Sequence, residues 1–294
     1  MTVSADQMLT TDSPEFRSMF PYQSRYFKFG PHKIHYVDEG SGPVLLLMHA
    51  CPMWVFSFRH IIRDFSMNHR VIAIDQIGLG LSDKPQDFDY RLEMHIEILE
   101  SFIARNGLKD ITFITHGRGS SIAVGYAVRN PEQVRAFIMM NAMDFSDFNL
   151  PFRLQICRHK WLEDFLLRRC KLMFWELFFA PRLLRECYEL PFRNPEDYEA
   201  IKHFVEDIPN GPDSDSAMSM YEIEAGLWLL RDKPTAVFWA KHDWLYGKKC
   251  LRHWMKYFPE AELHILKRSG RYLLEDSPEH LNDLIRDFLE RNRC

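Results

Sequence analysis

The residues around Gly117 are arranged to present one reactive side chain. Ile111 to His116 is an apolar, largely β-branched run that leads into a tight turn. The residues after the turn are spaced like the buried face of a helix: Ile122, Ala123, Val124, Tyr126 and Ala127. Strand, turn and helix in this order form a nucleophile elbow, which lifts its apex residue above the end of a parallel sheet. The apex is Gly117, so the stretch predicts the architecture of covalent catalysis without a nucleophile.

Strands and helices alternate on both sides of the elbow. Continuous apolar runs at 43–48, 71–75, 134–140 and 234–240 are typical of strands buried on both faces, and a further strand is expected at 261–266. Helical spacing of apolar residues predicts helices over 56–65, 91–106 and 278–291. An antiparallel hairpin is expected over 25–37. The fold class is therefore α/β, with a mostly parallel, doubly wound sheet covered on both faces.

The pattern changes between 145 and 231, where helical segments rich in large aromatic residues replace the strands. We expect a loose N-terminal arm at 1–24, a core at 25–144 and 232–294, and a helical cap at 145–231. The cap could simply pack on the core, or it could roof an apolar ligand pocket outside the carboxyl ends of the strands. We favour the roof.

Composition restricts the partners. A net charge of -4 without long charged blocks argues against nucleic acid as the main partner. The cysteines are dispersed without metal-ligand spacing, which argues against zinc: Cys51, Cys157, Cys170, Cys187, Cys250 and Cys294. No secretory signal and no apolar run long enough to span a bilayer are visible. We therefore expect a cytoplasmic protein with reduced thiols and no cofactor.

Five motifs in order carry a family resemblance. They are His49–Trp54, Asp75–Pro85, the elbow, the segment Phe204–Pro209, and Lys241–Asp243. Together they resemble the haloalkane dehalogenase family of α/β-hydrolases, and the cap motif looks closer still to the dehalogenase-like β-lactone decarboxylases of bacterial olefin synthesis. The resemblance covers residues 25 to 291 and implies an α/β-hydrolase fold with an inserted helical cap.

The resemblance also implies a mechanism with five parts. In the family, an aspartate at the elbow attacks carbon, and a late histidine activates water against the resulting ester. An acid orients that histidine, while a tryptophan and an asparagine donate hydrogen bonds to the departing anion. Such chemistry needs a nucleophile, a base of near-neutral pKa and preorganised donors.

Four of these five positions are substituted in this sequence. Gly117 stands at the nucleophile position, Arg271 at the base, Arg118 at the tryptophan and Cys51 at the asparagine. The surviving part is the acid, Asp243. By the same resemblance, His49 and Trp54 belong with Cys51 and Arg118 to the region that binds the leaving anion and the oxyanion. The resemblance therefore predicts a protein that is inactive by the family mechanism.

Three other residues could supply a displaced chemistry. Ser120 lies in the first helical turn and is expected to point into the helix–sheet packing. His116 is next to the apex on a strand, so its side chain should face away from that of the apex residue. Cys51 would be a nucleophile only if Arg118 or Arg271 lowered its pKa.

The substituted arginines have two interpretations. Loss of the base would leave a buried carboxylate unpaired, so we predict an ion pair between Asp243 and Arg271. In the favoured interpretation each arginine is neutralised locally, Arg118 by a cap acid such as Asp144 or Asp147. In the other, Arg118 and Arg271 converge on the old pocket and bind an anionic amphiphile such as a fatty carboxylate.

Three functions remain open from the sequence. The first is a catalytically silent homologue that binds a hydrophobic or amphiphilic molecule or a protein partner. The second is an active hydrolase or β-lactone decarboxylase that acts on hydrophobic substrates by displaced chemistry. The third is a protein-interaction scaffold with a collapsed pocket.

Overall fold

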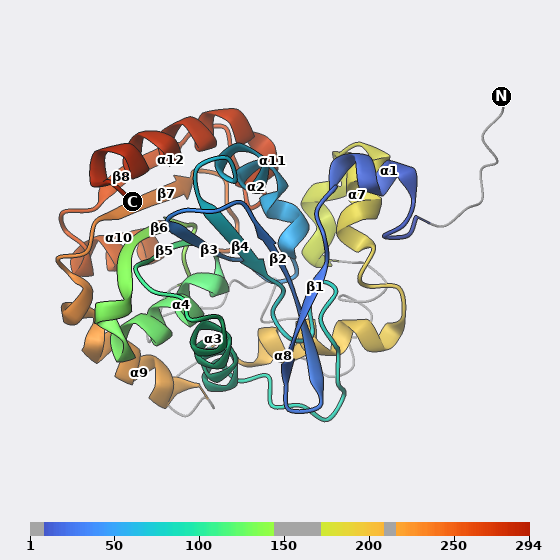
Figure 1. Cartoon of the computed structure of the whole chain (residues 1–294), viewed down its shortest axis with the longest axis horizontal. Coiled ribbons are helices and arrows are strands. Elements are labelled where there is room, and N and C mark those ends of the chain that lie inside the picture. The colour runs from blue at the N-terminus through green and yellow to red at the C-terminus, as the bar shows by residue number, and fades with distance from the viewer. Residues whose placement is uncertain (1–8, 144–171, 209–215) are drawn as a thin grey trace.

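A computed structural model describes residues 9–143, 172–208 and 216–294, and these form an eight-stranded sheet with helices on both faces (Figure 1). The strand order is β1-β2-β4-β3-β5-β6-β7-β8. The strands are β1 (Arg25–Phe29), β2 (His32–Glu39), β3 (Val44–Met48), β4 (Arg70–Ile74), β5 (Ile111–His116), β6 (Val134–Met140), β7 (Thr235–Ala240) and β8 (Glu262–Leu266). The two pairs that involve β2 are antiparallel, and the pairs from β4 to β8 are parallel. The predicted class and strands are confirmed.

The helices of the core cover the sheet in two layers. In Figure 1, α2, α11 and α12 lie above the sheet, and α3 and α4 lie below it. The core helices are α1 (Pro14–Met19), η1 (Val55–Phe58), α2 (Arg59–Phe65), α3 (Leu92–Asn106), α4 (Arg118–Arg129), η2 (Pro131–Gln133), α10 (Lys248–Tyr257), α11 (Leu273–Asp276) and α12 (Pro278–Asn292). The central strands are buried on both faces, as continuous apolar runs require.

The described residues between β6 and β7 contain helices and no strand. They are η4 (Leu172–Phe179), α7 (Arg182–Glu189), η5 (Pro195–Tyr198), α8 (Glu199–Glu206), α9 (Ala217–Gly226) and η6 (Leu227–Leu230). We call these the inserted helices. Within the described part of the chain, every helix is too short or too polar to cross a bilayer.

The N-terminal segment is better packed than its sequence suggests. A loose arm was expected over residues 1–24, but α1 forms there and buries Phe16 and Phe20. The ring of Phe16 stacks on Trp54 at 5.9 Å, and the ring of Phe20 lies 5.9 Å from Phe56. The expectation is therefore wrong for residues 14–20, because two aromatic side chains anchor the short helix to the core.

Candidate functional site

The elbow forms as predicted, and its apex is crowded. Gly117 lies between β5 and α4 with φ 55° and ψ -124°, a conformation that side chains rarely adopt. A Cβ atom added to Gly117 would lie 2.8 Å from the Cβ of Ala50 and 3.3 Å from both Cε2 and the hydroxyl of Tyr246. A side chain at position 117 would therefore require Ala50 and Tyr246 to move.

Arg118, the first residue of α4, is buried against the inserted helices. Its Nη2 donates to Asp207, which follows α8, and its guanidinium lies 4.9 Å from the ring centre of Phe204. Asp207 also accepts hydrogen bonds from the Leu92 amide at 3.1 Å and the Ser216 hydroxyl at 2.5 Å. The predicted local neutralisation of Arg118 is thus confirmed with a different acid.

The two acids named from the sequence, Asp144 and Asp147, lie outside the described residues.

The predicted ion pair between Asp243 and Arg271 is wrong. Among the described residues, no salt bridge joins the two. Burial raises the pKa of the Asp243 carboxyl, and the charge of nearby Arg271 only partly opposes that rise. The Asp243 carboxylate accepts instead from Asn141 Nδ2 at 2.7 Å and from the amides of Leu245 and Tyr246 at 2.7 and 3.2 Å. The carboxylate is therefore engaged by two amides of its own turn and by Asn141, which follows β6, rather than by the arginine.

Arg271 is held in a different way. Its side chain is 1% exposed, and Nη2 donates to the carbonyl oxygen of Cys51. The guanidinium lies 5.6 Å from the ring centre of Trp244. Nε and Nη1 of Arg271 have no hydrogen-bond partner among the described residues, and the same holds for Nε and Nη1 of Arg118. Two buried cations therefore each retain two unsatisfied donor atoms.

Cys51 does not have the character of a nucleophile. Burial raises the pKa of its thiol to about 12, and the opposing effects of Arg271 and Arg118 are smaller. The thiol is therefore protonated at neutral pH, and protonated thiols are weak nucleophiles.

The other two candidates for displaced chemistry are structural. Ser120 exchanges a hydrogen bond of 2.8 Å with Thr115 inside the helix–sheet packing, as expected. His116 is buried, and burial lowers its pKa to about 3, so it carries no charge at neutral pH.

Cys51, Arg118 and Arg271 line the same cavity. It has a volume of about 20 Å³, which is room for roughly one water molecule. Its lining comes from the core and from the inserted helices: Cys51, Arg118, Met143, Phe204, Val205, Ile208, Leu245, Tyr246 and Arg271. Of the sequence-predicted site residues, the structure brings Cys51, Arg118 and Arg271 together here.

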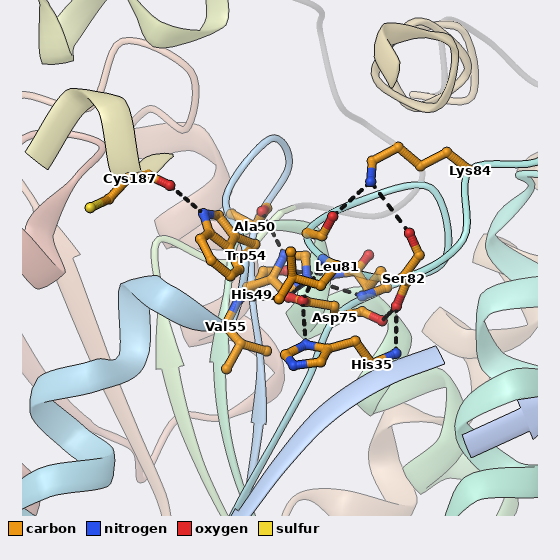
Figure 2. A network of polar contacts seen from close by, with 12 residues as sticks. His35, His49, Ala50, Trp54, Val55, Asp75, Leu81, Ser82, Lys84 and Cys187 are labelled. Carbon is orange, nitrogen blue, oxygen red and sulfur yellow. Dashed lines mark hydrogen bonds and ion pairs between the residues drawn. The ribbon is translucent and has the colours of Figure 1, made fainter. Parts of the chain in front are cut away.

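His49 and Trp54 do not line this cavity, contrary to the expectation that they help to bind an anion. Trp54 donates from Nε1 to the Cys187 carbonyl of α7 at 3.2 Å, within a network that surrounds Asp75 (Figure 2). His49 accepts at Nε2 from the amide of Gln76 at 3.0 Å. Both residues hold the loop that follows β3 in place, so their role in this structure is to position that loop.

Asp75 organises that network. Its carboxylate oxygens contact His35 Nδ1 at 2.7 Å and accept from the amides of Val55 at 2.7 Å and Leu81 at 2.9 Å (Figure 2). The fully buried carboxylate thereby ties the loops after β3 and β4 to strand β2. The buried motif Asp75–Pro85 is therefore architectural and fixes the loop that carries Cys51.

Sequence reasoning missed three residues at this site. Tyr246 lies three residues after Asp243, and Asp207 lies inside the quoted motif Phe204–Pro209, but nothing in their spacing points to the apex or to Arg118. Glu176 of η4 is the third. Burial raises the pKa of its carboxyl to about 7, with smaller contributions from Asp243 and Asp276, while Arg271 acts in the opposite direction.

A model of a known protein family matches most of this chain. The model described as alpha/beta hydrolase fold matches residues 43–278. The chain belongs to the α/β-hydrolase fold family. This hydrolase-fold protein is 30% identical over 285 residues to the cis-3-alkyl-4-alkyloxetan-2-one decarboxylase of Shewanella oneidensis, covering 92% of this chain and 90% of that relative.

Dehalogenases are also similar to this α/β-hydrolase. Haloalkane dehalogenase 2 of Mycobacterium tuberculosis is 26% identical over 277 residues, with 90% of this chain and 93% of that protein covered. The solved structure of haloalkane dehalogenase DatA from Agrobacterium tumefaciens superposes with a TM-score of 0.81 at 23% identity, covering 92% of this chain and 97% of DatA. The predicted dehalogenase-like fold, with β-lactone decarboxylase homologues, is confirmed.

Proposed function

We propose that this protein is a catalytically silent member of the α/β-hydrolase fold family that binds a small hydrophobic or amphiphilic molecule between the core and the inserted helices. One observation carries the proposal: Ala50 and Tyr246 crowd the place where the Cβ atom of a nucleophile at position 117 would stand. A missing side chain could be restored by one substitution, whereas a filled site has to be emptied as well.

The ligand-binding part of the proposal rests on the mixed lining of the cavity. Met143, Phe204, Val205, Ile208 and Leu245 supply apolar surface beside two guanidinium groups. The relatives are named for small organic substrates, an alkylated oxetanone and haloalkanes, which suits an apolar site. The four described cysteines are free thiols, and we propose a cytoplasmic location on that ground.

A protein-interaction scaffold is the second candidate. The observation in its favour is the small cavity, because small-molecule pockets usually enclose about 300–1,000 Å³, against about 20 Å³ here. A scaffold would show no saturable binding of small apolar molecules, whereas the proposed function requires it.

The activity test uses the protein as it exists. Incubation with a long-chain β-lactone or a bromoalkane should give no decarboxylated product, no bromide and no covalent adduct by intact-mass spectrometry. Turnover, or a mass increase that matches an alkyl or acyl enzyme, would support displaced chemistry and contradict the proposal.

A second activity test restores the family's catalytic residue types by substitution. Gly117→Asp, Arg271→His, Arg118→Trp and Cys51→Asn together restore the residue types that the family resemblance implies. We expect this set to stay inactive, because Ala50 and Tyr246 still crowd position 117. Adding Ala50→Gly and Tyr246→Ala should permit bromide release from a bromoalkane, and the matched control is the same enlarged set without Gly117→Asp. Equal bromide release by the four-residue set would show that crowding is not the obstacle.

A further inference from the structure

The cavity at the former active site contains an excess of unsatisfied buried donors. Nε and Nη1 of Arg118 and of Arg271 have no partner among the described residues, although these side chains are only 2% and 1% exposed. A buried donor without an acceptor loses its hydrogen bonds to water without replacement, and the loss is greater when the donor is charged. Both arginines line the same cavity, so one occupant can reach both.

The acids around the cavity leave these donors unfilled. Asp207 accepts from Arg118 through Nη2 alone, and it also serves Leu92 and Ser216. Asp243 is turned toward Asn141 and its own following amides. Glu176 lies near Arg271, but it leaves Nε and Nη1 of Arg271 without a partner among the described residues. The acceptor that would complete the two guanidinium groups therefore has to come from outside these three acids.

We infer that Arg118 and Arg271 together form a binding site for a carboxylate group, one oxygen facing each guanidinium. This rests on the proposed function and names the chemical class of its ligand. Guanidinium and carboxylate form charge-assisted hydrogen bonds that are about twice as strong as neutral ones. The cavity of about 20 Å³ has room for roughly one water molecule, so a carboxylate has to widen it on binding. The neighbouring side chains Met143, Phe204 and Leu245 suit an apolar chain attached to the carboxylate.

The carboxylate could belong to a free small acid or to the head of an apolar acid. Thermal unfolding is measured while sodium chloride is replaced by sodium acetate or sodium hexanoate at constant ionic strength, with acetamide as the uncharged analogue of acetate. At a tenfold excess over Kd, we expect the melting temperature to rise by about 2–5 °C. A rise with hexanoate that exceeds the rise with acetate assigns an apolar acid, and equal rises assign a small free acid.

Substitutions test whether the acetate-dependent rise in melting temperature comes from the two arginines. Arg271→Gln should abolish the acetate-dependent rise, and so should the double variant Arg118→Gln/Asp207→Asn, which removes the cation and its partner together. The matched control is Arg286→Gln, because Arg286 is an exposed guanidinium paired with Asp283 at 2.8 Å. Each variant is compared with its own melt in chloride, so altered stability does not obscure the result.

Several results would overturn the inference. They are no rise with either acid, an equal rise with acetamide, or an unchanged rise in both Arg271→Gln and the double variant. These results would leave the activity test untouched, because a silent protein can lack a carboxylate site. Turnover in the activity test would instead remove the proposed function, whatever the effect of carboxylates.

Discussion

At the scale of single residues, the site is defined by the close approach of positions 117 and 50. Gly117 has no side chain, whereas Ala50 carries a methyl group. The two Cβ positions would lie only 2.8 Å apart. Substitution of one position therefore depends on the size of the other, which is why a change at the apex alone cannot restore the family's site.

This dependence predicts a coupled effect on stability. Gly117→Ala should lower the free energy of unfolding by about 2–4 kcal/mol, because positive φ and crowding both oppose a side chain there. In an Ala50→Gly background the cost should fall by about 1 kcal/mol, measured by urea denaturation in a double-mutant cycle. Gly247→Ala is the control, since Gly247 has φ -86° and open space, and it should change stability little. Strictly additive effects at 50 and 117 would contradict the proposed contact.

At the scale of elements, Asp207 connects three helices. It follows α8, pairs with Arg118 at the start of α4, and accepts from the amide of Leu92 at the start of α3. Because the Leu92 amide is the first of α3, the Asp207 carboxylate also interacts favourably with the dipole of that helix. The inserted helices are thereby fixed to the core by a charged contact at the edge of the cavity.

Breaking this contact should be costly. Asp207→Asn is expected to lower the free energy of unfolding by about 3–5 kcal/mol, because the variant leaves Arg118 buried without its counterion. The double variant Arg118→Gln/Asp207→Asn should recover part of that loss. The exposed pair Arg286–Asp283 is the comparison, and Asp283→Asn should cost about 1 kcal/mol or less. A cost for Asp207→Asn as small as that at Asp283 would rule out the proposed role in fixing the helices.

The same elements show what a sequence can predict. The strands from β3 to β7 follow from continuous apolar runs, and α3 follows from its helical period and the left-handed cap at Gly107. Helix α1 was missed because it has six residues, and its stability comes from Phe16 packing on distant Trp54. The partners of Arg118 and Asp243 could not be predicted from residue spacing. Arg118 pairs with Asp207, which lies 89 positions away in the sequence, and Asp243 accepts from an amide of its own turn.

At the scale of the whole molecule, buried histidines contribute to the response to acid. Burial lowers the pKa of His95 and of His116 to about 3, and positive charge from Arg118 or Arg271 acts in the same direction. In the unfolded chain a histidine titrates near 6.5. Between pH 6.5 and 3 the unfolded state therefore binds more protons, so stability is present above pH 6.5 and is lost as the pH falls. Each of these histidines contributes a slope of about 1.4 kcal/mol per pH unit below pH 6.

His116→Leu should reduce this slope by the contribution of one proton. It should also stabilise the protein at pH 7 by about 1–2 kcal/mol, because neither ring nitrogen of His116 has a hydrogen-bond partner among the described residues. Urea denaturation from pH 7 to pH 5 measures both effects, and the control is His280→Gln at an exposed position of α12. Loss of stability at pH 7 with an unchanged slope would mean that His116 is solvated or paired in the native protein. Gain of stability with a shallower slope would show that the buried imidazole beneath the elbow is an electrostatic cost retained without a catalytic role.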